Sequence, residues 1–515
     1  MKKTLLAFLM LWCILQLNAH SLIPSPEQLT MTEECFELGK SPIRIYMQNE
    51  KIIPLSLLQT EVLDNASIRI TSRPNKADIR LRISADIQTE GYRLSITPKY
   101  IDIEATDKGG FVYALQTLRQ LRVGDENRWQ CVSVSDRPRM KWRGFMLDSG
   151  RQYQSVATIK KYIDMALMLK MNVFHWHLTE GLGWRIEIMK YPQFTQKGAF
   201  VGKGEEQQGF YSQEEIRELV NYAEERNITI VPEIDMPGHA EAALASYPEL
   251  GCFGLPVEIP KTGFTKNIFC AGKEHTIRVL KEVLDEVCQL FPSPYIHLGG
   301  DEAPKGNWDE CPDCQQRIKE NSLRDTHDLQ LWFSAEMANH LKNKGRKTMF
   351  WGDVVYKTGY TLPDNVIIQW WNYRSNKDLA LRNALKHGYP VVCSSNYYNY
   401  LNFPVTPWRD YQENRTFNLR DAYTRNPSYQ AVQEDNPLIW GMTCALWTDD
   451  GVTEALIDER LFPRILALAE QMWHYGKLAP FEVFHQRVKD KKAWFNSQGF
   501  MFGPAFKETD NEISH

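Results

Sequence analysis

Short apolar segments alternate with longer segments of helical spacing along the chain after residue 140. The apolar segments have few polar interruptions, as buried parallel strands do; they span 143–147, 172–177, 228–234, 294–298, 348–351, 366–371, 390–394 and 438–446. Helical spacing follows or separates them over 155–169, 212–223, 275–291, 328–343 and 453–473. About eight strands in this order favour an α/β fold, a (β/α)8 TIM barrel. A doubly wound open sheet is the alternative, although no glycine-rich nucleotide turn follows the first strand.

The first part of the chain has a different pattern. Segments 92–97 and 100–104 alternate apolar and polar residues, which predicts half-buried strands, and 110–121 has helical spacing. We therefore predict a small α+β domain over residues 22–138, ending near Arg137-Pro138-Arg139. The barrel and a C-terminal helix are expected over residues 139–510.

Residues 1–19 have two lysines directly after Met1 and continue with an apolar stretch from Leu5 to Leu17, which predicts a cleaved signal peptide. That stretch is short for a membrane span and no later segment qualifies, so we expect no membrane insertion. The expected location is the periplasm or the outside of the cell. A formal net charge of -4 offers no basic surface for nucleic acid.

The chain has ten cysteines, of which Cys13 lies inside the predicted signal peptide. In an oxidising compartment some of the others should pair. Cys252 and Cys270 flank a loop rich in glycine and proline and are the first candidates for a disulfide. Cys311-Pro-Asp-Cys314 fits a local disulfide or half of a zinc site, and in both cases a structural role is favoured.

The fourth predicted barrel strand ends in His-Leu-Gly-Gly-Asp-Glu at 297–302, which places two carboxyl groups, Asp301 and Glu302, side by side. Adjacent carboxyl groups repel each other, so one tends to keep its proton near neutral pH while the other is ionised. Acids are also common at solvated strand ends. Here, however, the pair closes an apolar strand in a chain with 15 tryptophans, flat side chains that often line sugar sites although most fill cores.

Other polar and aromatic residues follow the remaining predicted strands, at the end where barrel enzymes place their active sites. They are Asp148, Arg151, His175, His177, Glu180, Glu233, Asp235, His239, Trp351, Asp353, Trp370, Trp371, Tyr400, Asn402, Trp447 and Asp449. Each has a structural explanation by itself, since a histidine in an apolar strand more often belongs to the core. Their concentration at one end of the barrel predicts an active site.

Four ordered motifs carry a family resemblance. They are Arg-Gly-Phe-Met-Leu-Asp-Ser-Gly-Arg at 143–151, His-Trp-His-Leu-Thr at 175–179 with Gly-Trp-Arg at 183–185, Val-Pro-Glu-Ile-Asp-Met-Pro-Gly-His at 231–239, and the acid-pair motif at 297–302. Together they resemble the signature of glycoside hydrolase family 20, the β-N-acetylhexosaminidases. The domain at 22–138 resembles the small domain that precedes the barrel in that family.

The resemblance implies a retaining mechanism in which the 2-acetamido group of the substrate is the nucleophile and an oxazolinium ring forms. By position, Glu302 would be the general acid and then the base that activates water. Asp301 would orient the acetamido N–H and offset the developing positive charge, and Tyr400 would hydrogen-bond the acetamido oxygen. We expect no cofactor and no catalytic metal, and glycans with a terminal N-acetylhexosamine as substrates.

The resemblance also implies three aromatic walls around the acetamido methyl and the sugar face: Trp351, Trp371 and Trp447. Trp370 is the alternative to Trp371. Arg151 would bind the 3- and 4-hydroxyls, and His239 and Glu180 would support the general acid without contacting the sugar themselves. A purely structural role at the strand end is the alternative for Glu180.

The chain departs from the family pattern at three places. Glu180-Gly-Leu stands where Asp-Asp-Gln is usual, Asn402 where an Asp is usual, and Asp449 where a Glu is usual. In the family, the last two acids contact the 4- and 6-hydroxyls of the sugar. The loss of a carboxylate at Asn402 suggests tolerance for an anionic 6-substituent such as sulfate, with Arg409 as a charge partner, and neutral drift is the alternative.

Other functions are weighed against this one. A metal-dependent amidohydrolase would use His175, His177, His239 and Asp301 as ligands, but it leaves Glu302 without a role. A glycan-binding protein without activity would not need the acid pair and Tyr400. A lacto-N-biosidase, which releases a disaccharide, occurs in the same family.

Overall fold

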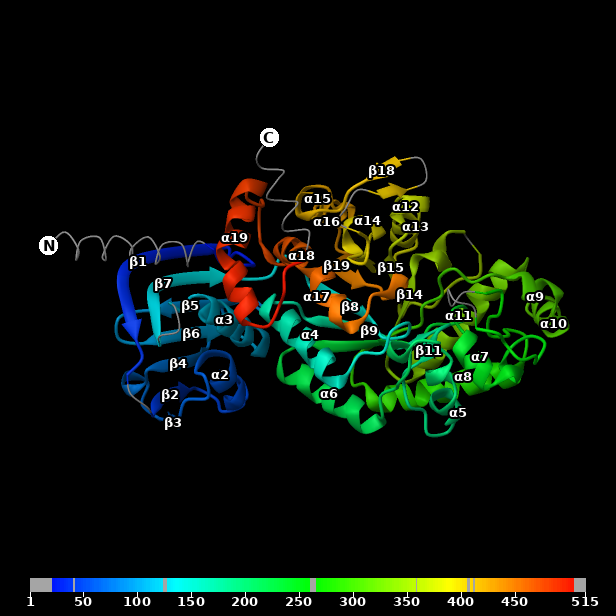
Figure 1. The fold of residues 1–515 in the computed structure, drawn as a ribbon, viewed down its shortest axis with the longest axis horizontal. Coiled ribbons are helices and arrows are strands. Elements are labelled where there is room, and N and C mark those ends of the chain that lie inside the picture. The colour runs from blue at the N-terminus through cyan, green and yellow to red at the C-terminus, as the bar shows by residue number, and fades with distance from the viewer. Residues whose placement is uncertain are drawn as a thin grey trace.

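The computed structural model describes residues 21–39, 42–123, 127–259, 265–357, 359–404, 408–410 and 413–503. The proposed signal peptide, residues 1–19, lies outside this part. The described chain forms a sheet domain followed by a larger barrel domain, side by side in Figure 1.

The sheet domain has seven strands in the order β1-β7-β5-β6-β4-β2-β3. Their bounds are β1 Gln28–Glu37, β2 Ile43–Met47, β3 Ile68–Ile70, β4 Ile79–Ile83, β5 Tyr92–Ile96, β6 Ile101–Ala105 and β7 Arg128–Asp136; the helices are α2 (Leu55–Val62) and α3 (Lys108–Gln120). The alternation read in β5 buries Tyr92, Leu94 and Ile96, and Asp107 caps α3 by accepting from the Gly110 N–H. The predicted α+β domain is confirmed.

Eight parallel strands close the barrel, and the predicted (β/α)8 fold is confirmed. In chain order they are β8 (Trp142–Asp148), β9 (Val173–His177), β12 (Thr229–Glu233), β13 (Tyr295–His297), β14 (Lys347–Trp351), β15 (Val366–Trp370), β16 (Val391–Cys393) and β19 (Ile439–Leu446). The larger surrounding helices are α4 (Val156–Met168), α6 (Gln213–Glu225), α8 (Glu274–Leu290), α11 (Thr326–Asn343), α13 (Leu379–Lys386) and α18 (Arg464–Trp473). Ser212 and Glu215 form the predicted capping box of α6.

Shorter elements lie in the connections. They are β10 (Thr179–Glu180), β11 (Gly183–Trp184), α5 (Gln193–Gln196), α7 (Glu241–Ser246), α9 (Gly306–Glu310), α10 (Pro312–Glu320), α12 (Tyr373–Asn376), α14 (Asn396–Asn399), β17 (Trp408–Asp410), β18 (Glu413–Arg415), α15 (Leu419–Thr424) and α16 (Pro427–Val432). Most follow the carboxyl ends of barrel strands, where they shape one end of the barrel.

The single helix predicted over 453–473 is wrong. The structure has a 3-10 turn at Glu454–Leu456, then α17 (Ile457–Leu461) and α18, which begins only after Pro463. Proline lacks the N–H that a continuous helix needs, and its ring clashes with the preceding turn. The C-terminal helix α19 (Phe481–Ser497) follows and lies between the two domains in Figure 1.

Buried charges join the two domains at the amino end of the barrel strands. Lys170, which precedes β9, lies 2.9 Å from Asp136 of the sheet domain, and both side chains are buried. Asp136 also accepts from the Trp473 indole at 3.0 Å. Arg143 of β8 is fully buried and lies 2.8 Å from Glu90. The active end of the barrel is opposite this interface.

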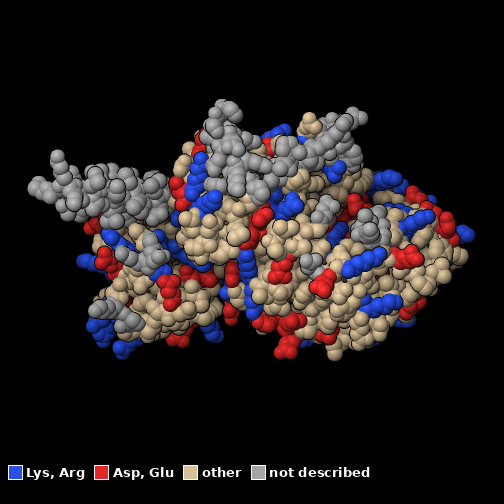
Figure 2. Space-filling model, viewed as in Figure 1, with Lys and Arg blue, Asp and Glu red and all other residues tan. Residues whose placement is uncertain are grey.

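Figure 2 shows basic and acidic side chains interspersed on the visible face, without a continuous basic surface. Among the described helices, none combines the length and the apolar character that a membrane span requires.

Candidate active site

The turn after β13 presents the acid pair, and it depends on two glycines. Gly299 and Gly300 have φ angles of +63° and +92°, in the left-handed region. A Cβ atom on Gly299 would lie 1.8 Å from Oδ1 of Asp235, and that oxygen accepts the Gly300 N–H at 3.1 Å. Asp235 thus fixes the turn from the neighbouring strand, and the turn delivers Asp301 and Glu302 to the carboxyl end of the barrel.

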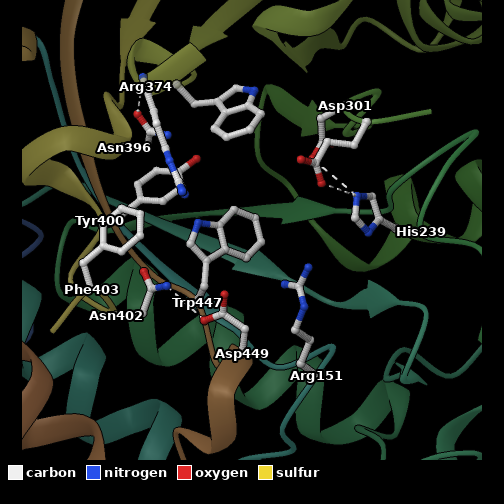
Figure 3. A pocket seen from close by; sticks show the side chains of 12 residues that line it. Arg151, His239, Asp301, Arg374, Asn396, Tyr400, Asn402, Phe403, Trp447 and Asp449 are labelled. Atoms are coloured by element: carbon white, nitrogen blue, oxygen red, sulfur yellow. Dashed lines mark hydrogen bonds and ion pairs between the residues drawn. The ribbon is translucent and has the colours of Figure 1, made fainter. Parts of the chain in front are cut away.

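The two acids line a pocket with a cavity volume of about 230 Å³. Figure 3 shows Asp301 and His239 on one side of it, Arg374 and Asn396 on the opposite side, and Trp447 between them. Its lining residues are Arg151, His239, Asp301, Glu302, Trp371, Arg374, Asn396, Tyr400, Asn402, Phe403, Trp447 and Asp449. They come from the loops after most of the barrel strands, and nine of the twelve are among the residues singled out at the predicted strand ends.

His239 lies between the acid pair and a buried carboxylate. Its Nδ1 is 2.7 Å from Glu180, and its Nε2 is 3.5 Å from Asp301 and 3.8 Å from Glu302. Burial alone would lower the pKa of His239, but Glu180 and Asp301 outweigh burial and raise it well above its ordinary value. Burial likewise opposes the charge of Glu180, yet Arg151 and His239 hold the pKa of Glu180 below its usual range. The imidazolium form is therefore favoured beside the acids.

Arg151 provides a second fixed cation. It lies 2.9 Å from Asp148 and 3.1 Å from Glu180, with its guanidinium carbon 5.1 Å from the ring centroid of Trp447. Burial acts against its charge, but the carboxylates of Glu180 and Asp148 raise the pKa of Arg151. This arrangement leaves an oriented guanidinium at the pocket wall.

Glu302 has the environment of a proton donor. Its side chain is half exposed, with burial and the neighbouring Asp301 carboxylate raising its pKa. The Glu302 N–H donates to Oδ1 of Asp353 at 3.2 Å, and Oδ2 of Asp353 accepts from the Trp371 indole. Burial, followed by the charge of Asp301, raises the pKa of Asp353 to about 7. Asp353 therefore links the backbone of the acid to an aromatic wall.

The aromatic residues differ in their positions. Trp371, Tyr400 and Trp447 line the pocket, and the Trp371 and Tyr400 rings stack with centroids 6.2 Å apart. Trp351 is buried behind them, 5.7 Å from Trp447, and donates to Glu233 at 2.7 Å. The alternative to Trp371, Trp370, is buried and donates to the Lys377 carbonyl outside the pocket.

Three buried histidines surround Glu233 beneath the pocket. His175, His177 and His297 approach its carboxylate to 2.8, 2.7 and 3.2 Å. The amidohydrolase alternative needs the first two of them in one ligand set with His239 and Asp301. In the structure His175 groups with Glu233 and His297, whereas Asp301 groups with Asp235 and His239. The His-x-His pair therefore supports Glu233 and does not line the pocket.

Some pocket residues were not predicted. Arg374, Asn396 and Phe403 lie in short helical turns and loops, so strand ends gave no signal beyond their closeness in sequence to Trp371 and Tyr400. Asn396 accepts the Arg374 backbone N–H at 3.0 Å. The Asn402 amide donates to Asp449 at 2.9 Å, so two of the three departures from the family pattern contact each other.

The predicted Cys252–Cys270 disulfide is absent, because both residues are free thiols in the structure. Their sulfur atoms lie 3.9 and 3.6 Å from that of Cys314. The prediction failed because two of the cysteines that meet here come from the loop after β13, far along the chain.

Comparisons with known proteins assign both domains to one family. The glycosyl hydrolase family 20 catalytic domain matches residues 140–475, and domain 2 of that family matches residues 19–137. A β-hexosaminidase of Porphyromonas gingivalis is 34% identical over 91% of this chain, which spans 62% of that relative. The crystal structure of a β-N-acetylhexosaminidase from Bacteroides fragilis is 58% identical, with a TM-score of 0.91 over 95% of this chain and 98% of that one.

A Vibrio harveyi exo β-N-acetylglucosaminidase, solved in complex with N-acetylglucosamine, is 28% identical, with a TM-score of 0.82 over 95% of this chain and 79% of that one. The family assignment thus covers both domains, and its catalytic part contains the whole pocket. The chain belongs to glycosyl hydrolase family 20 and is a glycoside hydrolase.

Proposed function

We propose that the protein is an exo-acting, retaining β-N-acetylhexosaminidase. It removes terminal β-linked N-acetylglucosamine or N-acetylgalactosamine from the non-reducing ends of glycans. The observation that carries the proposal is the pairing of Asp301 with Glu302 in one pocket, with His239 within 4 Å of both carboxylates. The Vibrio harveyi relative, an exo-acting enzyme solved with N-acetylglucosamine, supports this choice of sugar.

Glu302 protonates the leaving oxygen and then takes a proton from the attacking water. Its raised pKa favours the protonated form that the first step needs. Its half-exposed side chain remains within reach of water for the second.

Asp301 and Tyr400 act on the acetamido group of the substrate. The Asp301 carboxylate accepts the amide N–H and offsets the positive charge of the oxazolinium ring, and the Tyr400 hydroxyl donates to the amide oxygen. Burial, followed by the charge of Asp301, raises the pKa of Tyr400 well above its ordinary value, so the hydroxyl keeps its proton. Trp371 and Trp447 restrict the amide to one orientation, which brings its oxygen toward the anomeric carbon.

The test compares aryl glycosides of N-acetylglucosamine, N-acetylgalactosamine and glucose. Substrate-assisted catalysis requires the amide, so the glucoside should be hydrolysed at least about a hundredfold more slowly. Nuclear magnetic resonance of the first product formed should show the β anomer. Equal turnover of the glucoside would refute the mechanism, and release of an intact disaccharide from a tetrasaccharide would favour lacto-N-biosidase activity.

We also propose that the pocket tolerates a 6-sulfate on N-acetylglucosamine. The support is the neutral Asn402 at a position where an acid is usual, together with the unpredicted cation Arg374 in the same pocket lining. Asp449 keeps one carboxylate nearby, but it already accepts from Asn402. The side chain of Arg409, the partner suggested from the sequence, lies outside the described residues. The predicted signal peptide supports an exported enzyme that acts on external glycans.

A further inference from the structure

Four cysteines converge from the loops after β12 and β13, although no step of the mechanism uses them. Cys252, Cys270, Cys311 and Cys314 are all buried, and their sulfur atoms all lie within 4.8 Å of one another. The individual separations are 3.9 Å for Cys252–Cys314, 3.8 Å for Cys270–Cys311 and 3.6 Å for Cys270–Cys314. We propose that this cluster is a structural zinc site.

The sulfur separations have the size that tetrahedral zinc requires. With zinc–sulfur bonds of about 2.3 Å, the edge of a regular ZnS4 tetrahedron is about 3.8 Å. A disulfide would instead bring two sulfurs to about 2.05 Å. In this cluster Cys270 and Cys314 each have two close sulfur neighbours, which is the connectivity of a shared centre and not of two separate pairs.

The local backbone supports thiolate ligands. Cys311 occupies the N-cap position of α10 and Cys314 lies in its first turn, where the helix N-terminus stabilises negative charge. The Cys-Pro-Asp-Cys spacing fits the two-residue gap common in structural zinc sites. Lys273 donates to the Gly251 carbonyl at 2.7 Å, which places an ammonium beside the residue that precedes Cys252.

The cluster joins the loop that carries His239 to the loop that carries the acid pair. Cys252 and Cys270 belong to the loop after β12, which also carries His239; Cys311 and Cys314 follow the turn after β13, which carries Glu302. A hydrogen bond joins the same two loops: the Trp308 indole donates to the Phe269 carbonyl at 3.0 Å. Zinc would therefore fix the loop of Glu302 relative to the loop of His239, and it would take no part in the reaction itself.

The first experiment measures metal in the full-length protein, purified without chelators, by inductively coupled plasma mass spectrometry. We expect about one zinc per chain, released when a mercurial titrates the thiols and detected with a pyridylazo dye. Cys314→Ser should lose the metal and lower the Tm, whereas Cys288→Ser, at a half-buried cysteine outside the cluster, should keep both. Replacement by cobalt should produce thiolate charge-transfer absorption that Cys314→Ser lacks.

The metal content of the unmodified protein tests the proposal even if Cys314→Ser fails to fold. Protein without zinc would overturn it, as would an unreduced mass lower by two hydrogens for each disulfide. Iron in place of zinc, or zinc that Cys314→Ser retains in full, would overturn it as well. None of these readouts depends on substrate, so they are independent of the proposed glycosidase activity.

Discussion

The side-chain amide of Asn402 donates a 2.9 Å hydrogen bond to Oδ1 of Asp449, joining the loops after two adjacent barrel strands at the pocket. At these two positions the family pattern has two carboxylates, whereas this chain has only the carboxylate of Asp449. The amide also orients that remaining charge, because it occupies one of the carboxylate oxygens. Both residues of this pair depart from the family pattern, and selectivity should depend on them.

Asn402→Asp should reduce the acceptance of sulfated substrate. A second carboxylate beside Asp449 repels an anionic 6-substituent by about 1 kcal/mol or more, so the ratio of kcat/KM for 6-sulfated over plain aryl N-acetylglucosaminide should fall at least about fivefold. Asn402→Ala removes the amide without adding charge and is the matched control. An unchanged ratio in Asn402→Asp would contradict the sulfate proposal.

Glu302→Gln should lower kcat about 10²- to 10⁴-fold on chitobiose, because the amide cannot donate a proton to the departing sugar. The loss should be smaller on an aryl glycoside whose leaving group needs little protonation. Glu310 is an exposed glutamate in the same connection after β13, and Glu310→Gln should leave both rates unchanged. A loss that is independent of the leaving group would argue against the role of general acid.

The alkaline limb of the pH profile should report the proton on Glu302. Activity is present while Glu302 is protonated and falls as pH rises through its raised pKa. Burial and, after it, the charge of Asp301 raise this pKa; Asp301→Asn removes the second cause and should move the limb to lower pH. His239→Gln removes a cation that lowers it and should move the limb to higher pH. Profiles of kcat/KM on chitobiose measure both shifts, and equal displacement in one direction would contradict the assignment.

Asp136→Asn should destabilise the whole chain. It leaves the ammonium of Lys170 buried without an anion, which typically costs about 3–5 kcal/mol. Thermal unfolding should show a clear fall in Tm. Asp364→Asn removes an exposed partner of Lys342 and should leave Tm nearly unchanged. Similar Tm values for the two variants would show that the domain interface contributes little.

Gly299→Ala should disrupt the acid turn, because its Cβ would meet Asp235 at 1.8 Å. Gly388→Ala is the matched control: its φ is +77°, but nothing lies within 4 Å of the added atom. The control should cost about 1–2 kcal/mol for the left-handed backbone alone. Gly299→Ala should cost more and lose most activity, as measured by chemical denaturation and by kcat. Equal effects would mean that the turn tolerates the contact.

The barrel was predictable because each buried strand is a short apolar segment and each helix has a regular spacing. The same reasoning found the acid pair, Arg151 and Tyr400, since strand ends must meet at one end of a closed barrel. The prediction of one continuous helix over 453–473 failed at Pro463. Apolar residues have helical spacing on both sides of this proline, but the proline itself interrupts the helix.

Residues held by loops were beyond this reasoning. Arg374 and Phe403 reach the pocket through the path of short turns, which no periodicity describes. The sequence indicated two separate cysteine pairs but not their convergence into one cluster, because the two pairs lie in loops after different strands. Sequence spacing shows which neighbours share a loop, but only folding brings Cys252 and Cys314 together.

The ionic contacts beneath the barrel limit how far this enzyme can be shortened. A fragment starting at residue 139 would retain every side chain of the pocket but would strip the counter-ions from Arg143 and Lys170, leaving two cations in an apolar foundation. The small domain makes no contact with sugar in the proposed mechanism. Its contribution to catalysis is indirect: it supplies the anions that neutralise buried cations of the barrel, and so it stabilises the domain that carries the pocket.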